Sequence, residues 1–167
     1  MKTGAGNISG PGARTIADSV QVVEFILGKE HFAIDLFDVK EVVEYTQITQ
    51  LPNAPIYVKG MISLRSEITT IIDLKVQMHI KETQTFSEEN SKFIVLDEKI
   101  TRSKVGIMVD DVLAVSTFSR NQVDTTTSFG SGDGSIIGTI NKKIGGKEKD
   151  GSDLVIWIDI KRILKDL

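Results

Sequence analysis

The 167-residue sequence contains no cysteine and only two histidines. Without cysteine, disulfide bonds and thiolate metal sites are excluded, and this composition is compatible with a reducing cytoplasm. The histidines, His31 and His79, lie far apart and lack the spacing of a metal-binding motif. We therefore expect both histidines to be structural and predict no metal site.

Long apolar runs are absent as well. The longest runs span four or five residues, whereas a helix that crosses a membrane needs about 20. After Lys2, glycine, asparagine and serine interrupt the apolar stretch that a signal peptide requires. We therefore expect no export and no direct membrane insertion, and we expect a cytoplasmic protein.

The sequence has no cluster of positive charge. The net charge is -3 and the isoelectric point is near 5.4, which argues against nucleic acid as the main partner because phosphate binding requires clustered lysine and arginine. The lysines between residues 142 and 149 are interrupted by glycine and balanced by acidic residues. We interpret this stretch as a solvated hairpin tip.

Catalytic groups have no evident place in the pattern. Adjacent Asp110 and Asp111 could form an acid/base pair or a cation site, but neighbours in a strand point to opposite faces, so we predict a turn after Val109. We predict that Asp73 caps a short helix. The glycine-rich run at 129–135 lacks the Lys and Ser/Thr of a phosphate-binding loop. We predict a non-enzymatic protein without a cofactor.

The remaining pattern is typical of an all-β protein. Residues 1–18 are rich in Gly, Ser and Pro and predict a flexible tail, which leaves 19–167 as the folded domain. Short β-branched and alternating segments predict strands, and polar residues 81–91 predict a linker between two halves. Short helical turns are expected after Pro55, over 74–78 and over 160–167. Without long amphipathic helices, the strands favour barrels or a sandwich.

Nine collinear segments resemble CheW-type chemotaxis coupling proteins: residues 25–34, 39–42, 48–55, 58–65, 71–74, 93–96, 105–110, 137–140 and 156–160. Their order and spacing both fit, and the resemblance covers about residues 20–165. It implies two five-stranded β-barrels of the Src-homology-3 type, packed side by side over a shared apolar core. The barrels are expected at about residues 35–85 and 90–150, with crossing terminal segments.

The same resemblance implies an adaptor in signal transduction. Its expected partners are the cytoplasmic tip of methyl-accepting chemoreceptors and the regulatory domain of the CheA histidine kinase. The protein is therefore expected to be recruited to membrane-associated receptor arrays. The implied receptor-binding residues are Val39, Glu41, Gly60, Leu64, Arg65, Phe93 and Val115. Core packing is the alternative for Val39, Phe93 and Val115, and loop stabilisation is the alternative for Arg65.

The chain departs from the family pattern around Arg65. The usual run Asn-Leu-Arg-Gly is replaced by Ser63-Leu64-Arg65-Ser66, and Thr70 stands where proline is common. Because Ser66 replaces glycine in a turn that could need a positive φ, the conformation that presents Arg65 is open. Two other functions stay open: a CheW-like module of another kinase or motility pathway, and a small β-barrel enzyme or ligand-binding protein that uses Asp110, Asp111 and the 130–135 loop.

Overall fold

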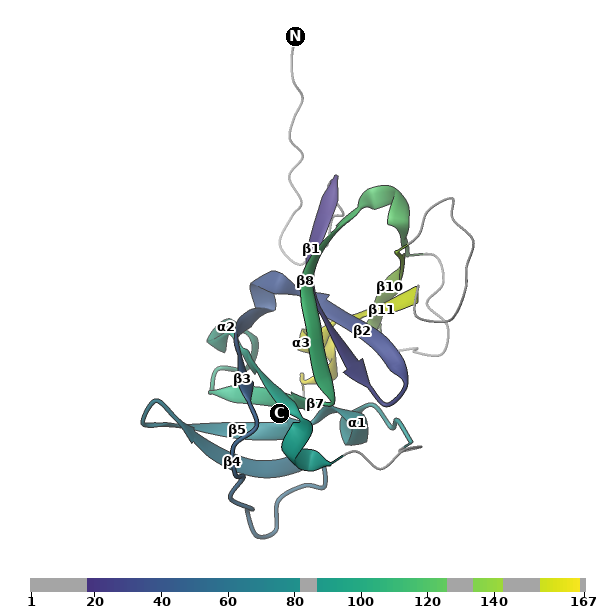
Figure 1. The fold of residues 1–167 in the computed structure, drawn as a ribbon. Helices are drawn as coiled ribbons and strands as arrows, with labels where there is room; N and C mark the ends of the chain where they lie inside the picture. Colours follow the sequence, from purple (N-terminus) through teal and green to yellow (C-terminus); the bar gives the residue numbers. More distant parts are fainter. Residues whose placement is uncertain (1–17, 82–86, 126–133, 143–153, 166–167) are drawn as a thin grey trace.

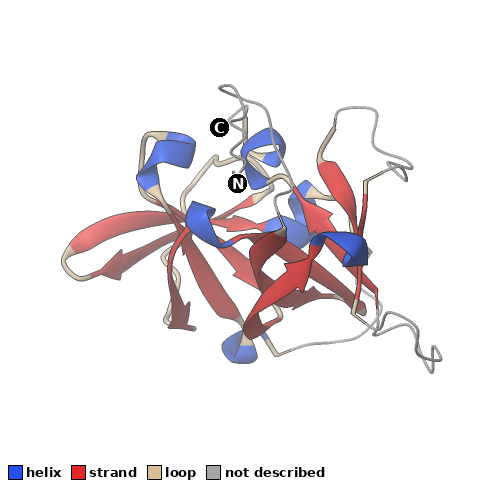
Figure 2. Ribbon diagram, turned by 90° about the horizontal axis from the view of Figure 1, so that it is seen from above, coloured by secondary structure: helices blue, strands red, loops and turns tan. Residues whose placement is uncertain are grey.

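The structure is a computed structural model that describes residues 18–81, 87–125, 134–142 and 154–165 (Figure 1). Its strands are β1 (Ser19–Leu27), β2 (Glu30–Asp35), β3 (Val39–Glu44), β4 (Val58–Leu64), β5 (Glu67–Asp73), β6 (Lys92–Leu96), β7 (Val105–Val109), β8 (Asp111–Ser119), β9 (Val123–Asp124), β10 (Ile136–Asn141) and β11 (Leu154–Ile158). Its α-helices are α1 (Leu74–Gln77), α2 (Glu98–Thr101) and α3 (Ile160–Ile163), and its 3-10 helices are η1 (Leu36–Asp38), η2 (Glu88–Asn90) and η3 (Arg120–Gln122). Figure 2 shows that strands dominate and that the helices are short pieces between them. The predicted all-β class is confirmed.

Strands β3 to β7 form the first barrel, in the order β3-β6-β7-β5-β4. Only β5 and β7 pair in parallel, and the other pairs are antiparallel. Beyond β3, Thr49 and Met61 of β4 exchange two backbone hydrogen bonds of 2.8 Å. The chain that leaves one edge of the sheet thus reaches the other edge and closes it.

The second sheet has the order β8-β1-β2-β11-β10-β9. Strand β8 runs through η3 directly into β9, so the chain itself joins the two edges and the sheet curls into a second barrel. Strands β2 and β11 pair in parallel. The predicted five strands are found in the first barrel, while the short β9 adds a sixth strand to the second.

The barrels do not divide the chain at the predicted boundary. Strands β6 and β7 lie beyond residue 90 but belong to the first sheet, and β1 and β2 precede that sheet but belong to the second. Strand β7 pairs with both β5 and β6, so the first barrel cannot close without residues 92–109. The expected ranges of 35–85 and 90–150 are therefore wrong, although the crossing of terminal segments is present.

The predicted shared core lies between the two barrels. Its buried residues come from both sheets and from α3, and they include Phe25, Phe32, Ile34, Ile94, Ile107 and Ile160. The Phe25 and Phe32 rings are stacked with centroids 6.0 Å apart. Burial of each large apolar side chain stabilises the fold by about 1.5–3 kcal/mol. This cluster therefore joins the barrels into one folded unit.

Each barrel also has an interior cluster of its own. In the first barrel these residues are Ile62, Ile71, Phe93 and Met108. In the second barrel they are Val20, Val22, Ala33, Phe118, Ile140, Val155 and Trp157. Adjacent residues of one strand face different clusters, as Ala33 and Ile34 do, because side chains alternate across the sheet.

Aspartates begin the short helices. The Asp73 carboxylate accepts hydrogen bonds from the backbone N–H groups of Lys75, at 3.1 Å, and Val76, at 3.3 Å, which confirms its predicted capping role. Asp159 caps α3 in the same way, and α3 buries Ile160 as expected. After Pro55 the chain forms a turn rather than a helix.

Three predicted features fall almost entirely outside the described residues. They are the tail at 1–18, the glycine-rich loop at 129–135 and the lysine-rich hairpin at 142–153.

Candidate functional site

The tip of the β4–β5 hairpin carries Arg65. Leu64 pairs with Glu67, so Arg65 and Ser66 alone form the turn, and both have positive φ, 52° and 67°. Two-residue hairpin turns with positive φ at both positions match the twist of the strands, but they favour Asn and Gly. The turn thus has the positive φ that the sequence left open at Ser66, and neither of its two residues is glycine.

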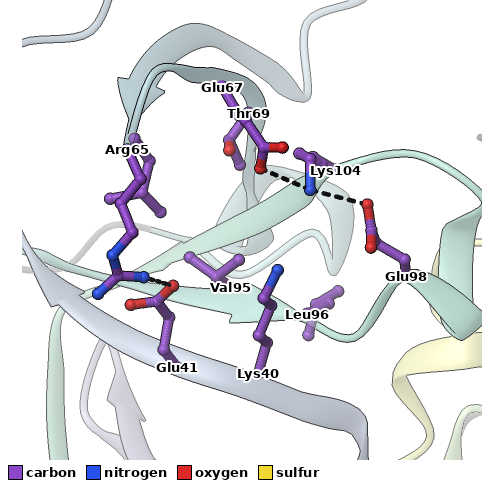
Figure 3. A pocket seen from close by; sticks show the side chains of 10 residues that line it. Lys40, Glu41, Arg65, Glu67, Thr69, Val95, Leu96, Glu98 and Lys104 are labelled. Carbon is purple, nitrogen blue, oxygen red and sulfur yellow. Dashed lines mark hydrogen bonds and ion pairs between the residues drawn. The ribbon is translucent and has the colours of Figure 1, made fainter.

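An ion pair connects this tip to the opposite edge of the first barrel. Nη1 of Arg65 contacts Oε2 of Glu41 on β3 (Figure 3). The Arg65 side chain remains 70% exposed, whereas that of Glu41 is 20% exposed. Glu41 therefore orients the guanidinium of Arg65, and most of the N–H donors of that guanidinium face solvent.

A second set of ion pairs lies beside the first. Nζ of Lys104, the residue before β7, lies 2.7 Å from Oε2 of Glu67 and 2.9 Å from Oε1 of Glu98 on α2 (Figure 3). Hydrogen bonds to Glu67 and Glu98 raise the pKa of Lys104 above its ordinary value. The hydrogen bond and the positive charge of Lys104 lower the pKa of the Glu98 carboxyl. Lys104 and Glu98 are therefore both charged at neutral pH.

These groups surround a small depression at the mouth of the first barrel. Its free volume is about 40 Å³, which is room for one or two water molecules and far below the several hundred Å³ of a typical small-molecule site. The lining residues are Lys40, Glu41, Leu64, Arg65, Glu67, Thr69, Val95, Leu96, Glu98 and Lys104. The geometry suits contact between surfaces better than enclosure of a small ligand.

The structure brings together only part of the predicted receptor-binding set. Glu41, Leu64 and Arg65 line the same depression. Val115 lies on β8 of the other barrel and is 59% exposed. Val39 begins β3, is half-buried and packs against the shared core.

Two predicted contact residues are buried. Phe93 is 0% exposed and packs in the interior cluster of the first barrel. Gly60 is buried with φ 146°, and a Cβ there would lie 2.2 Å from the Thr49 carbonyl oxygen. Its role is to let two backbone segments meet where the barrel closes.

Strand β8 adds an apolar outer surface. Among the described strands it lies at the edge of its sheet, beside β1 alone. Leu113 is 41% exposed and Val115 is 59% exposed. An edge strand with two exposed aliphatic side chains is a candidate binding surface.

A buried ion pair at the junction of the barrels was not foreseen. Nζ of Lys75 lies 2.8 Å from Oδ1 of Asp110, and the side chains are only 10% and 3% exposed. The Gly28 N–H donates to Oδ2 of Asp110 at 2.6 Å. Asp110 thus links α1, the β1–β2 turn and the β7–β8 turn. The predicted turn after Val109 is present. The charged Asp110, which ends the apolar run of β7, was the signal in the sequence for this junction.

The two histidines lie apart from the depression beside Arg65 and do not line it. His31 is half-buried and His79 is exposed. Within the described part of the chain, no three His, Asp or Glu side chains are grouped as they would be to hold a metal ion. The same residues include no helix with the length and hydropathy to span a bilayer.

The fold and the site together define a double-barrel β module whose exposed groups are suited to contacts with other proteins. The family model of the CheW-like domain matches residues 21–167. Chemotaxis protein CheW of Treponema pallidum is 32% identical over 87% of this chain and 82% of its own length. The Thermotoga maritima protein of the same name is 29% identical over 92% of this chain and 95% of its own. The chain belongs to the CheW-like family of chemotaxis proteins.

A solved structure has the same fold. The scaffolding protein TtCheW from Thermoanaerobacter tengcongensis superposes with a TM-score of 0.67 at 28% identity, over 84% of this chain and 88% of that one. The predicted family is confirmed, and so is the predicted double-barrel architecture.

Proposed function

We propose that this chain couples methyl-accepting chemoreceptors to the CheA histidine kinase by binding both, without catalysing a reaction. The observation that carries the proposal is the Arg65 tip: a guanidinium ion-paired to Glu41 that still has 70% of its side chain exposed. A charged group held in one orientation and open to solvent is suited to a partner carboxylate. Binding to receptors would bring the protein to membrane-associated arrays.

The receptor partner is proposed to be a helical tip. A helix docks through an apolar strip flanked by polar groups. Val115 and Leu113 on β8 supply exposed apolar side chains, and Glu41 and Arg65 supply polar ones. Val39 on β3 packs against the shared core between the barrels, and its proposed role is to support this surface.

The kinase partner is proposed to be the regulatory domain of CheA. A coupler must bind kinase and receptor at the same time, so the two contacts require separate surfaces. Ile56 is 84% exposed and Ile68 is 66% exposed. These side chains offer apolar contacts on the first barrel. Ile68 points to the opposite face of β5 from Glu67 and Thr69, which line the depression beside Arg65.

A pull-down with purified CheA and a receptor signalling fragment tests the coupling function. Wild-type chain is expected to give a ternary complex. Binding to neither partner would refute the proposal, whereas binding to the kinase alone would restrict it to a kinase module without a receptor contact.

The Arg65→Glu variant tests the site itself. Reversing the charge places a carboxylate beside Glu41 and removes the guanidinium, so receptor affinity in titration calorimetry is expected to fall by about tenfold, which is about 1.4 kcal/mol. The unfolding midpoint should barely move because an exposed ion pair contributes little stability.

Arg102→Glu is the matched control. Arg102 is also exposed, lies on the first barrel and has φ 61°, so the backbone cost of the substitution is similar. Its receptor affinity is expected to equal that of the wild type. A large loss of stability in Arg65→Glu alone would instead assign Arg65 a structural role.

A further inference from the structure

Beyond the Arg65–Glu41 pair, we infer that Lys104 is a positioning residue that holds the Arg65 turn in its binding conformation through Glu67 and Glu98. The inference rests on the proposed receptor contact of Arg65. Lys104 itself would not touch the receptor. It would act through the hairpin.

The turn needs restraint because its conformation is unfavourable for its residues. Arg65 and Ser66 both have φ in the left-handed region, 52° and 67°, where residues other than Gly and Asn are disfavoured. A turn of this kind persists when its surroundings fix it. Glu67, the residue that follows the turn, is where the restraint acts.

Lys104 connects that residue to a fixed part of the barrel. Its carbonyl oxygen accepts a 3.0 Å hydrogen bond from the Thr70 N–H, so its backbone is anchored to β5. Its Nζ then reaches Glu67 at 2.7 Å and Glu98 at 2.9 Å. Lys104 is therefore held between the end of the hairpin and α2 (Figure 3).

The two sets of ion pairs restrain the hairpin from two sides. Arg65 reaches Glu41 on β3, and Glu67 reaches Lys104 beside β7. The Lys104 side chain is only 25% exposed, so it is less hydrated than an ordinary surface lysine. Without the Lys104 contacts, the ion pair that the described residues still give the turn is the one through Arg65, which is itself proposed to bind the receptor.

The first test is Lys104→Gln, with receptor affinity and backbone dynamics as readouts. Affinity is expected to fall three- to tenfold, and amide exchange of residues 65–67 is expected to rise. Lys104→Arg should restore both because it retains the charge. Lys99→Gln on α2 is the matched control, since Lys99 is exposed and lies on the helix that carries Glu98.

The decisive test combines Lys104→Gln with Arg65→Glu. If Lys104 acts through Arg65, Lys104→Gln costs no further affinity in the Arg65→Glu background. An equal loss in both backgrounds would overturn the inference, as would unchanged exchange at the turn. If the wild type binds no receptor fragment, the proposed function fails, but the exchange measurement still decides whether Lys104 holds the turn.

A pH titration by NMR checks that the contact exists in solution. Lys104 lowers the pKa of Glu98 below 4.5, while Lys40 also lowers it and Asp97 raises it; Glu67 faces Lys104 from β5. The stabilisation from Glu98 is complete above pH 4.5 and is lost as pH falls through the lowered pKa. In Lys104→Gln the Glu98 carboxyl should titrate at higher pH than in the wild type. An unchanged titration would show that the pair does not form.

Discussion

Ser66 makes the hairpin turn strained in a way that one substitution can relieve. At φ 67°, a serine side chain is disfavoured where glycine is not. We expect Ser66→Gly to raise the free energy of unfolding by about 0.5–1 kcal/mol, and to raise the melting temperature by about 1–4 °C. Thermal unfolding followed by circular dichroism measures this.

Ser63→Gly provides the opposite control. Ser63 lies in β4, on the same hairpin, and is exposed. Glycine within a strand costs about 0.5–1 kcal/mol, so this variant should melt below the wild type. A destabilised Ser66→Gly would mean that the positive φ is absent in solution.

Single residues also set the limit of what the sequence could predict about the site. Arg65 and the doubtful turn at Ser66 were identified because they stand in a recognisable run. For Phe93 the sequence left contact and core packing open, because strand alternation shows that one face is buried but not which face a curled sheet encloses. Lys104 and Glu98 were missed because the contact joins segments that no periodic pattern relates.

At the scale of elements, the Lys75–Asp110 pair joins α1 to the turn between β7 and β8. Removing one partner of a buried pair leaves an uncompensated charge and typically costs about 3–5 kcal/mol. We expect Lys75→Met to lose that much stability in urea unfolding. The double variant Lys75→Met with Asp110→Asn should regain part of it, because the amide oxygen can still accept from Gly28.

Lys92→Met is the comparison for a more exposed pair. Nζ of Lys92 lies 3.4 Å from Oε2 of Glu44 and 3.6 Å from Oδ1 of Asp111, with both acidic side chains largely exposed. Its loss should cost less than about 1 kcal/mol. Equal losses in Lys75→Met and Lys92→Met would show that burial does not distinguish the two pairs.

Elements themselves were the most predictable level of the fold. The β1–β2 hairpin, the cap at Asp73 and the α3 segment follow from turn residues, capping residues and apolar spacing that lie close together in sequence. The division into barrels does not, because it depends on parallel pairing of β5 with β7, in which Thr70 pairs with Val105, 35 positions further along the chain. A polar linker at 81–91 lies between strands of one barrel and thus marked no boundary.

At the scale of the whole molecule, the shared core predicts a single unfolding transition. Phe25 is 0% exposed and belongs to the core cluster that residues of both sheets form. Phe25→Ala should cost about 3–5 kcal/mol and should lower the stability of both barrels together. Trp157 is the only tryptophan and reports on the second barrel, while amide exchange of β7 reports on the first. Separate transitions for the two probes would contradict a common core.

Because the first barrel is inserted within the strand order of the second, the two barrels cannot be completed at the same time on the ribosome. Strands β3 to β7 have all been synthesised by residue 109, whereas β2 lacks its neighbour β11 until residue 158. Domains generally fold as their segments emerge. The nascent chain therefore holds every strand of the first barrel, and β8 beside β1, while the free edge of β2 still waits for β11. The core that both barrels share can close only when this last strand has been added.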